Sequence, residues 1–412
     1  MNMSKRAPFL ISICDQVINS GTNLIASILI ARTLGVEGFG EFSLYLMVMY
    51  LVLGMKNSLV NAPLMYDIGR VNRCGLKIAE EYVVFEILTS VIFTVALLLL
   101  YCILVRIGLD VAFSSVLLPM LYSYGEFCRK VIYSVKKDLY APLLSFLKSF
   151  SLLLGLFYLV DGSGVISVED VLVVYFYSAV VLFLGSFLVI NSIGIKQRFL
   201  LSEFLKIWKQ TKDFSVWLFY GSILSFFREH FISVFSGVML GSGVVGGIRS
   251  AQTILGIFQT FYMALENVLP VRASEKKIKE GSLMTVIFLI KIYFIIILLF
   301  FPFFILMFFK SEEILVFVYG ESYGSYGYFV KFFIFIYLSY FTAYMISIFL
   351  RAEGFTKVIF IGGVASSIFS VFGAYPFMYI WGGVGAIAAI CIAPILGIAV
   401  NLFCLRLLYS KE

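Results

Sequence analysis

Long apolar stretches separated by short polar segments dominate the pattern of the chain. The stretch from Ile287 to Phe309, for example, is interrupted only by Lys291 and Pro302. A helix of about twenty apolar residues satisfies its own backbone hydrogen bonds across roughly 30 Å of hydrocarbon. The pattern therefore predicts about twelve membrane-spanning helices, at about 9–31, 42–65, 82–105, 112–132, 140–160, 171–194, 214–237, 245–270, 283–309, 328–350, 356–379 and 384–408.

The composition supports lipid as the solvent of this chain. Hydrophobic residues make up 61% and charged residues 13% of the sequence, whereas a soluble domain is about half apolar and a quarter charged. The six cysteines are scattered and form no paired spacing, which argues against a disulfide framework or a metal site. We therefore expect an all-α integral membrane protein that needs neither a metal nor another cofactor.

Lysine and arginine residues collect in alternate connections between the predicted spans. The connections on one side hold only Arg32, Arg106 and Lys310, and the other side holds nearly all the remaining basic residues outside the spans. Because cytoplasmic loops are enriched in Lys and Arg, the basic side is the predicted cytoplasmic side and both termini lie there. Topology thus accounts for the net charge of +7 without nucleic-acid binding.

The connection at 196–213 resembles a basic amphipathic helix, with Phe199, Phe204 and Trp208 among its apolar positions. Such a helix is expected to lie on the membrane surface, although docking of a cytoplasmic partner is an alternative. It divides the chain into an N-terminal six-helix bundle (1–195), the connector (196–213) and a C-terminal six-helix bundle (214–412).

The two predicted bundles share an internal repeat. Residues of the first half recur in the second at a nearly constant offset: Leu34, Gly35, Gly40, Asn61 and Pro63 correspond to Leu240, Gly241, Gly246, Asn267 and Pro270. Six spans per half give both halves the same orientation, so the repeat predicts a parallel pseudo-two-fold axis along the membrane normal. Chance matches of Gly and Pro are the alternative explanation.

Charged residues inside the predicted spans are the main candidates for function. An ionised side chain at mid-membrane costs about 2.5–3.5 kcal/mol, so such residues usually face a wet interior or one another. Those near the ends of spans can instead reach the membrane surface. The cations within spans are Lys56, Lys148, Arg228, Arg249, Lys291 and Lys331, and the acids are Asp15, Glu86, Glu126, Glu229 and Glu266.

The first span carries a polar stripe at spacings of three and four residues. Its members are Ser12, Asp15, Gln16, Asn19, Asn23 and Ser27. This spacing places them on one face of a helix. The stripe predicts a water-filled path, with interhelical hydrogen bonding as the alternative.

The seventh span holds Arg228, Glu229 and His230, and His230 is the one histidine of the chain. Adjacent residues point about 100° apart on a helix, so the three cannot face a single partner. His230 could titrate near neutral pH or pack as a neutral side chain.

The segment from Ala31 to Gly40, ARTLGVEGFG, resembles the junction after the first span of polysaccharide flippases of the O-antigen transporter (Wzx) type. These belong to a superfamily that includes the MATE exporters and the lipid II flippases. The segments 320–323 and 350–354 resemble further landmarks of the family. The resemblance implies a MATE-like fold and a transporter, not an enzyme.

The implied activity is movement of an undecaprenyl-pyrophosphate-linked oligosaccharide, an O-antigen repeat unit, from the cytoplasmic to the periplasmic leaflet of the bacterial inner membrane. By resemblance, the flippase acts by alternating access and works as a monomer in the bilayer. A glycan polymerase and chain-length machinery are its implied partners. A cation-exporting multidrug antiporter of the MATE type is the alternative. A membrane enzyme of glycan assembly, such as a polymerase, is the second alternative.

The charge of the cargo suggests roles for the intramembrane residues. A pyrophosphate requires cations to offset its desolvation, whereas an exporter of organic cations needs carboxylates. We expect a cationic substrate cavity formed by Lys56, Lys148, Arg228, Arg249 and Lys291. Its polar face is expected to comprise Asn19, Asn23, Asn61 and Asn267. The candidates for coupling to H⁺ or Na⁺ are Asp15, Glu229 and His230.

Overall fold

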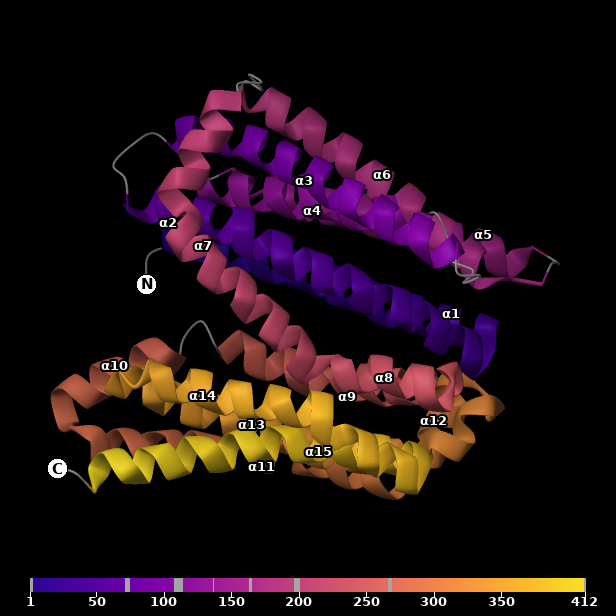
Figure 1. The fold of residues 1–412 in the computed structure, drawn as a ribbon, viewed down its shortest axis with the longest axis vertical. Helices are drawn as coiled ribbons and strands as arrows, with labels where there is room; N and C mark the ends of the chain where they lie inside the picture. The colour runs from indigo at the N-terminus through magenta and orange to yellow at the C-terminus, as the bar shows by residue number, and fades with distance from the viewer. Residues whose placement is uncertain are drawn as a thin grey trace. The chain divides into compact units, whose positions relative to one another are not determined.

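The computed structural model describes residues 3–70, 75–106, 114–135, 137–162, 165–195, 201–265 and 269–410. These residues are almost entirely helical and include no β-strand. They form two compact units, each shown as a bundle of helices in Figure 1. Unit 1 comprises Met1–Leu34 and Tyr45–Ile223, and unit 2 comprises Gly35–Leu44 and Leu224–Glu412.

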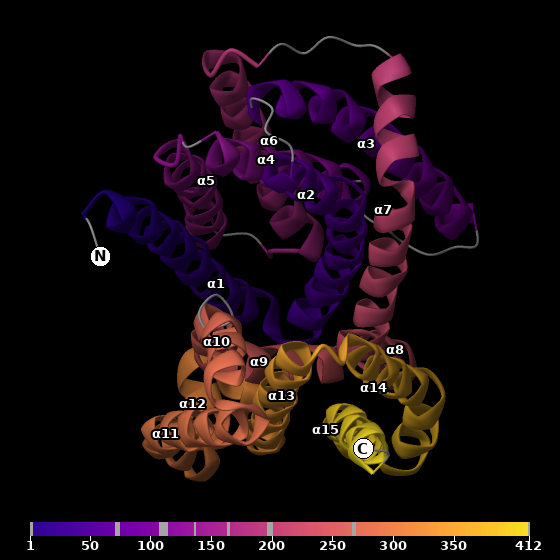
Figure 2. The same cartoon turned by 90° about the vertical axis from the view of Figure 1, so that its left-hand side faces the viewer.

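Unit 1 contains the helices of the first half of the chain. They are α1 (Met3–Lys56) apart from Gly35–Leu44, a π-helix (Asn57–Asn61), α2 (Ala62–Arg70), α3 (Gly75–Arg106), α4 (Ser114–Ser134), α5 (Tyr140–Asp161), α6 (Val168–Ser192) and most of α7 (Leu201–Glu229). Helix α6 packs against both α4 and α5, and α3 packs against α4 (Figure 2).

Unit 2 contains the remaining helices. They are α8 (Phe231–Leu240), α9 (Ser242–Leu265), α10 (Leu269–Glu280), α11 (Ser282–Phe309), α12 (Ser311–Tyr319), a 3₁₀ helix (Glu321–Tyr326), α13 (Gly327–Glu353), α14 (Thr356–Ile368), a π-helix (Phe369–Gly373) and α15 (Ala374–Tyr409). Helix α15 packs against α13 and α14, and α9 packs against α8 and α13.

The predicted spans coincide with helix over their described residues, except for the break at His230 and the last two residues of the span 171–194. Seven described helices are long and apolar enough to cross a membrane, and the pair α7 and α8, bent by 47°, adds an eighth. Two of the seven, Cys14–Ile68 and Thr356–Leu408, contain 55 and 53 residues, about twice the length of one crossing. Each is kinked at a glycine with positive φ, Gly35 or Gly382. The prediction of an all-α membrane protein is confirmed.

The segment predicted as a connector belongs to a longer helix. Residues 196–200 lie outside the described residues, and 201–213 form the first part of α7, which continues to Glu229 without a break. The Phe204 ring stacks on Phe85 of α3 at 5.1 Å between centroids. Trp208 packs against the same buried cluster of α3 and α4. The apolar face of this segment therefore packs on unit 1, and the change from unit 1 to unit 2 falls after Ile223.

The repeated glycines have matching conformations and contacts. Gly35 and Gly241 both have positive φ, 69° and 92°, which favours glycine because it has no Cβ. Gly40 lies so close to the carbonyl oxygen of Ser242 that a Cβ would overlap it, and Gly246 lies equally close to the carbonyl oxygen of Val36. The repeat relates Gly40 to Gly246 and Val36 to Ser242, so each of these two contacts is the counterpart of the other. This is expected for elements related by a local two-fold axis.

Replacing Gly246 by alanine is expected to destabilise the protein by about 1–3 kcal/mol, because the added methyl group meets backbone atoms that cannot rotate away. Gly256, on the same helix α9, has no atom within 4 Å of the position of a Cβ, so Gly256→Ala should be neutral or stabilising. Thermal unfolding of both purified variants in detergent tests this difference. Equal melting temperatures would contradict the proposed close helix contact.

Candidate functional site: polar clusters within the helical units

The largest polar cluster of unit 1 is centred on Asp15 of α1, whose side chain is almost completely buried. Its carboxylate accepts a hydrogen bond from Arg129 Nη2 of α4 at 2.5 Å and one from Tyr133 Oη at 2.8 Å. Ser145 of α5 donates its hydroxyl to the other carboxylate oxygen. The buried negative charge of Asp15 is thereby compensated by a cation and by neutral donors from two neighbouring helices.

Arg129 connects Asp15 to a second carboxylate. Its Nη1 lies 2.6 Å from Glu126 Oε1, three residues earlier on α4. The Glu126 side chain is 40% exposed, whereas that of Arg129 is 16% exposed. A guanidinium group suits this role because its planar set of five N–H donors can serve two carboxylates at once.

Asn19 extends the cluster towards Lys148. One turn after Asp15, its amide nitrogen donates to Ser145 Oγ at 2.9 Å, and its amide oxygen accepts from Lys148 Nζ of α5 at 2.6 Å. The Lys148 ammonium group also lies 5.7 Å from the centroid of the Tyr122 ring. Lys148 forms no ion pair with any described residue. Two of its three N–H groups therefore remain available to a ligand or to water.

The structure places part of the predicted stripe in this cluster and part outside it. Asp15 and Asn19 form interhelical hydrogen bonds, the alternative interpretation of the stripe. Gln16 and Asn23 are exposed. Nothing is described for the side chain of Ser12.

Lys56 corrects the expectation of a free cavity cation. Its Nζ lies 2.8 Å from Glu86 Oε2 of α3, and both side chains are only 1% exposed. The same ammonium group donates to Thr89 Oγ1 at 2.7 Å and to Ser90 Oγ at 3.0 Å. The N–H groups of Lys56 are thus fully used within unit 1, because α3 places the Glu86 carboxylate and two hydroxyl groups beside them.

Asn61, predicted to line the polar face of a cavity, is 4% exposed. It ends the π-helix that begins directly after Lys56. Its side-chain oxygen is buried and accepts no hydrogen bond from the described residues. Asn267, the corresponding residue of the repeat, and Glu266 lie outside the described residues.

The predicted charged triplet of unit 2 lies at a break between two helices. Arg228 Nη2 pairs with Glu229 Oε1 at 2.7 Å, with side chains 35% and 48% exposed. His230 has φ −123° and separates α7 from α8, where the axis bends by 47°. The expectation that these adjacent residues point about 100° apart holds only for a continuous helix. The helix breaks at His230, so the expectation does not apply to this residue.

The remaining predicted cations of unit 2 lie on separate helices. Arg249 is half-buried on α9, and Lys291 is exposed on α11. Lys331 of α13 lies 5.6 Å from the centroid of the Phe308 ring. Of the five predicted cavity cations, Lys56 and Arg228 are thus neutralised by carboxylates, and Lys148 is the one tied into the polar cluster of unit 1.

Sequence reasoning missed three members of that cluster. Arg129 was counted with a basic cytoplasmic connection. Its guanidinium group instead forms an ion pair with Asp15 within unit 1. Tyr133 and Ser145 have no distinguishing pattern in the sequence. The spacing of Glu126 and Arg129 at i and i+3, together with an intramembrane Asp15 that requires a cation, was the available signal for Arg129.

No protein-family model matches the chain, and no curated protein matches it. Solved structures do match over nearly its whole length. Lipid II flippase MurJ in an inward closed conformation has a TM-score of 0.67 and 16% identity, covering 97% of this chain and 87% of MurJ. An inward-facing MATE family multidrug resistance transporter has a TM-score of 0.61 and 17% identity, covering 98% and 99%.

A third match is a transporter of the MOP superfamily from Pyrococcus furiosus, described as having a binding pocket of reverse polarity that suggests a different function. Its TM-score is 0.63 at 14% identity, covering 98% of this chain and 95% of that one. The three proteins are transporters. At these identities the likeness concerns the fold, and the chain has the membrane-transporter fold shared by MurJ and the MATE family.

Proposed function

We propose that this chain is a flippase that moves an undecaprenyl-pyrophosphate-linked oligosaccharide from the cytoplasmic to the periplasmic leaflet of a bacterial inner membrane by alternating access. The fold supports a membrane transporter, and a lipid flippase is among the proteins that share it. The choice of an anionic lipid-linked cargo rests on the charges within the helical units.

The observation that carries the proposal is Lys148. A lysine without a carboxylate partner, placed on a membrane-spanning helix, is costly unless an anion compensates it. Lys148 is held by Asn19 and keeps two N–H groups for such an anion. A pyrophosphate offers charged oxygens to these N–H groups, and charge-assisted hydrogen bonds to it are stronger than neutral ones. The remaining predicted cavity residues, Arg249 and Lys291, are proposed to contribute positive charge in unit 2.

Coupling to an ion is proposed to involve Asp15. In the described arrangement its carboxylate and that of Glu126 share Arg129. Protonation of Asp15 would remove one of these two attractions and loosen the contact between α1 and α4. Glu229 and His230, at the bend between α7 and α8, are the corresponding candidates in unit 2.

A cation-exporting antiporter remains the second candidate, and two observations favour it. The MATE structures cover this chain as completely as MurJ does. Two intramembrane carboxylates, Glu126 and Glu229, are 40% and 48% exposed. Since the fold includes a transporter whose pocket is described as having reverse polarity, the fold alone does not select the cargo.

Deletion of the gene in its own host separates the two candidates. The flippase proposal expects lipid-linked repeat units to accumulate on the cytoplasmic leaflet and surface glycan to disappear, with drug sensitivity unchanged. Hypersensitivity to organic cations with normal surface glycan would overturn it in favour of the antiporter. If repeat units reach the periplasmic face but are not polymerised, the protein would instead act in polymerisation.

A further inference from the structure

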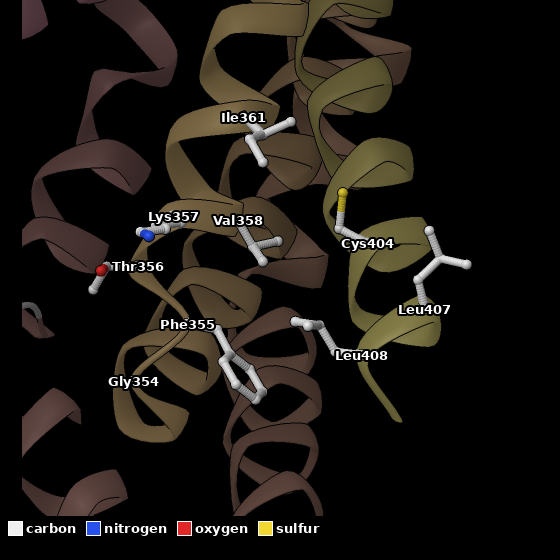
Figure 3. Close-up of a pocket in the computed structure, with 9 residues that line it drawn as sticks. All are labelled: Gly354, Phe355, Thr356, Lys357, Val358, Ile361, Cys404, Leu407 and Leu408. Carbon is white, nitrogen blue, oxygen red and sulfur yellow. The ribbon is translucent and has the colours of Figure 1, made fainter. Parts of the chain in front are cut away.

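A pocket of about 460 Å³ opens between the start of α14 and the end of α15. Its lining residues are Gly354, Phe355, Thr356, Lys357, Val358, Ile361, Cys404, Leu407 and Leu408 (Figure 3). The volume lies within the range of about 300–1,000 Å³ that is typical of ligand-binding pockets. No residue of the polar clusters described above lines it.

The walls of this pocket are apolar. Val358 and Ile361 lie one turn apart on α14, and Leu408 lies near the end of α15 (Figure 3). Both helices belong to a segment long and apolar enough to cross the membrane. In a bilayer, an apolar recess at the end of two spanning helices is filled by hydrocarbon more favourably than by water.

The edge of the pocket is positively charged. Lys357, in the first turn of α14, is exposed and forms no ion pair with any described residue. The first-turn N–H groups of a helix lack intrahelical acceptors, and Phe355 at the N-cap provides no side-chain cap. The positive end of the helix dipole therefore adds to the charge of Lys357.

We propose that this pocket binds an anionic membrane phospholipid, with an acyl chain between Val358, Ile361 and Leu408 and the phosphate headgroup at Lys357. The charge pattern predicts this end of unit 2 to be cytoplasmic, where lysines attract anionic lipids. The apolar walls and the cationic edge together match the two parts of a phospholipid. This proposal does not depend on the transported substrate.

Photo-crosslinking of the purified full-length protein tests the site. The probe is phosphatidylglycerol with a photoreactive acyl chain, and the labelled peptides are identified by mass spectrometry. The proposal expects labelling of peptides that contain 354–361 and 404–408. Lys357→Met should weaken binding of the probe about fivefold, the effect of one lysine near an anionic surface. Ile361→Trp should fill the pocket and lower labelling at least tenfold.

Ile380→Trp is the matched control, because Ile380 is exposed on the first part of α15 and does not line the pocket; its labelling should equal that of the unmodified protein. Two results would overturn the proposal. One is a failure of selectivity: labelling by a phosphatidylcholine probe that equals labelling by the phosphatidylglycerol probe, or labelling of both pocket variants that equals labelling of the unmodified protein. The other is labelling displaced by undecaprenyl phosphate but not by phosphatidylglycerol, which would assign the pocket to a polyprenyl chain.

Discussion

Replacing Lys56 by methionine is expected to cost about 3–5 kcal/mol of stability, because the substitution leaves the carboxylate of Glu86 buried without its cation. Both side chains are 1% exposed, and Lys56 has no exposed surface through which it could bind a substrate. Little folded Lys56→Met protein should therefore be recovered from membranes. Fluorescence-detected size-exclusion chromatography and thermal unfolding measure this loss.

The double variant Lys56→Met with Glu86→Gln should recover much of the folded protein. Glutamine at position 86 removes the buried charge and keeps an oxygen to accept the hydrogen bond that Ser123 donates. Lys206→Met is the control, since its pair with Glu81 is partly exposed and contributes at most about 1 kcal/mol. A stable, folded but inactive Lys56→Met protein would restore the original expectation that Lys56 lines a substrate cavity.

Replacing Lys148 by methionine is expected to lower transport by about tenfold to a hundredfold while the protein stays folded. A hydrogen bond to a charged group contributes about 1.5–3 kcal/mol, and each 1.4 kcal/mol corresponds to a tenfold change. Because Lys148 forms no ion pair with a described residue, its removal leaves no carboxylate unpaired. The transport rate and the melting temperature are measured on the same preparation.

Lys331→Met is the control for loss of a positive charge within a spanning helix. Lys331 contacts the ring of Phe308 and lies outside the polar cluster of unit 1, so its replacement should leave transport near the unmodified rate. Lys148→Arg should retain part of the activity, because the charge is preserved while the geometry of the donors differs. A Lys148→Met protein that loses its fold and its transport together would indicate a structural role instead.

The arrangement of helices along the chain was largely predictable because it depends on local patterns. Apolar stretches of spanning length located every membrane helix over its described residues. Positive φ at Gly35 and Gly241 agrees with the repeat found in the sequence. The short helices α10 and α12 were not predicted, since α10 is basic and α12 is only 9 residues long.

Pairings between distant residues were not predictable from patterns of this kind. Lys56 and Glu86 are 30 residues apart, and either could equally have faced water. The π-helices at Asn57–Asn61 and Phe369–Gly373 have no distinctive composition. Single-sequence reasoning thus located the intramembrane charges but assigned Lys56 to a substrate cavity, because it could not locate Glu86 as its partner. The pairing of Arg228 with the adjacent Glu229 could be read from the sequence.

Arg129 is a residue whose role within the bundle was missed because its acidic partner is distant in the sequence. Position alone suggested a residue at the cytoplasmic end of a helix, counted with the charges that set the orientation of the chain. Its contact with Asp15 joins residues 114 positions apart. The intramembrane aspartate requires such a cation, but four basic residues in the same part of the chain could have supplied it.

The central claim is that the chain moves an anionic lipid-linked oligosaccharide, and reconstitution into proteoliposomes tests it most directly. The measurement follows a fluorescent undecaprenyl-pyrophosphate oligosaccharide as it becomes accessible to a membrane-impermeant glycosidase. We predict faster transfer than in protein-free vesicles and a rate at least tenfold lower with Lys148→Met. Transfer no faster than in protein-free vesicles, with uptake of an organic cation in its place, would contradict the account.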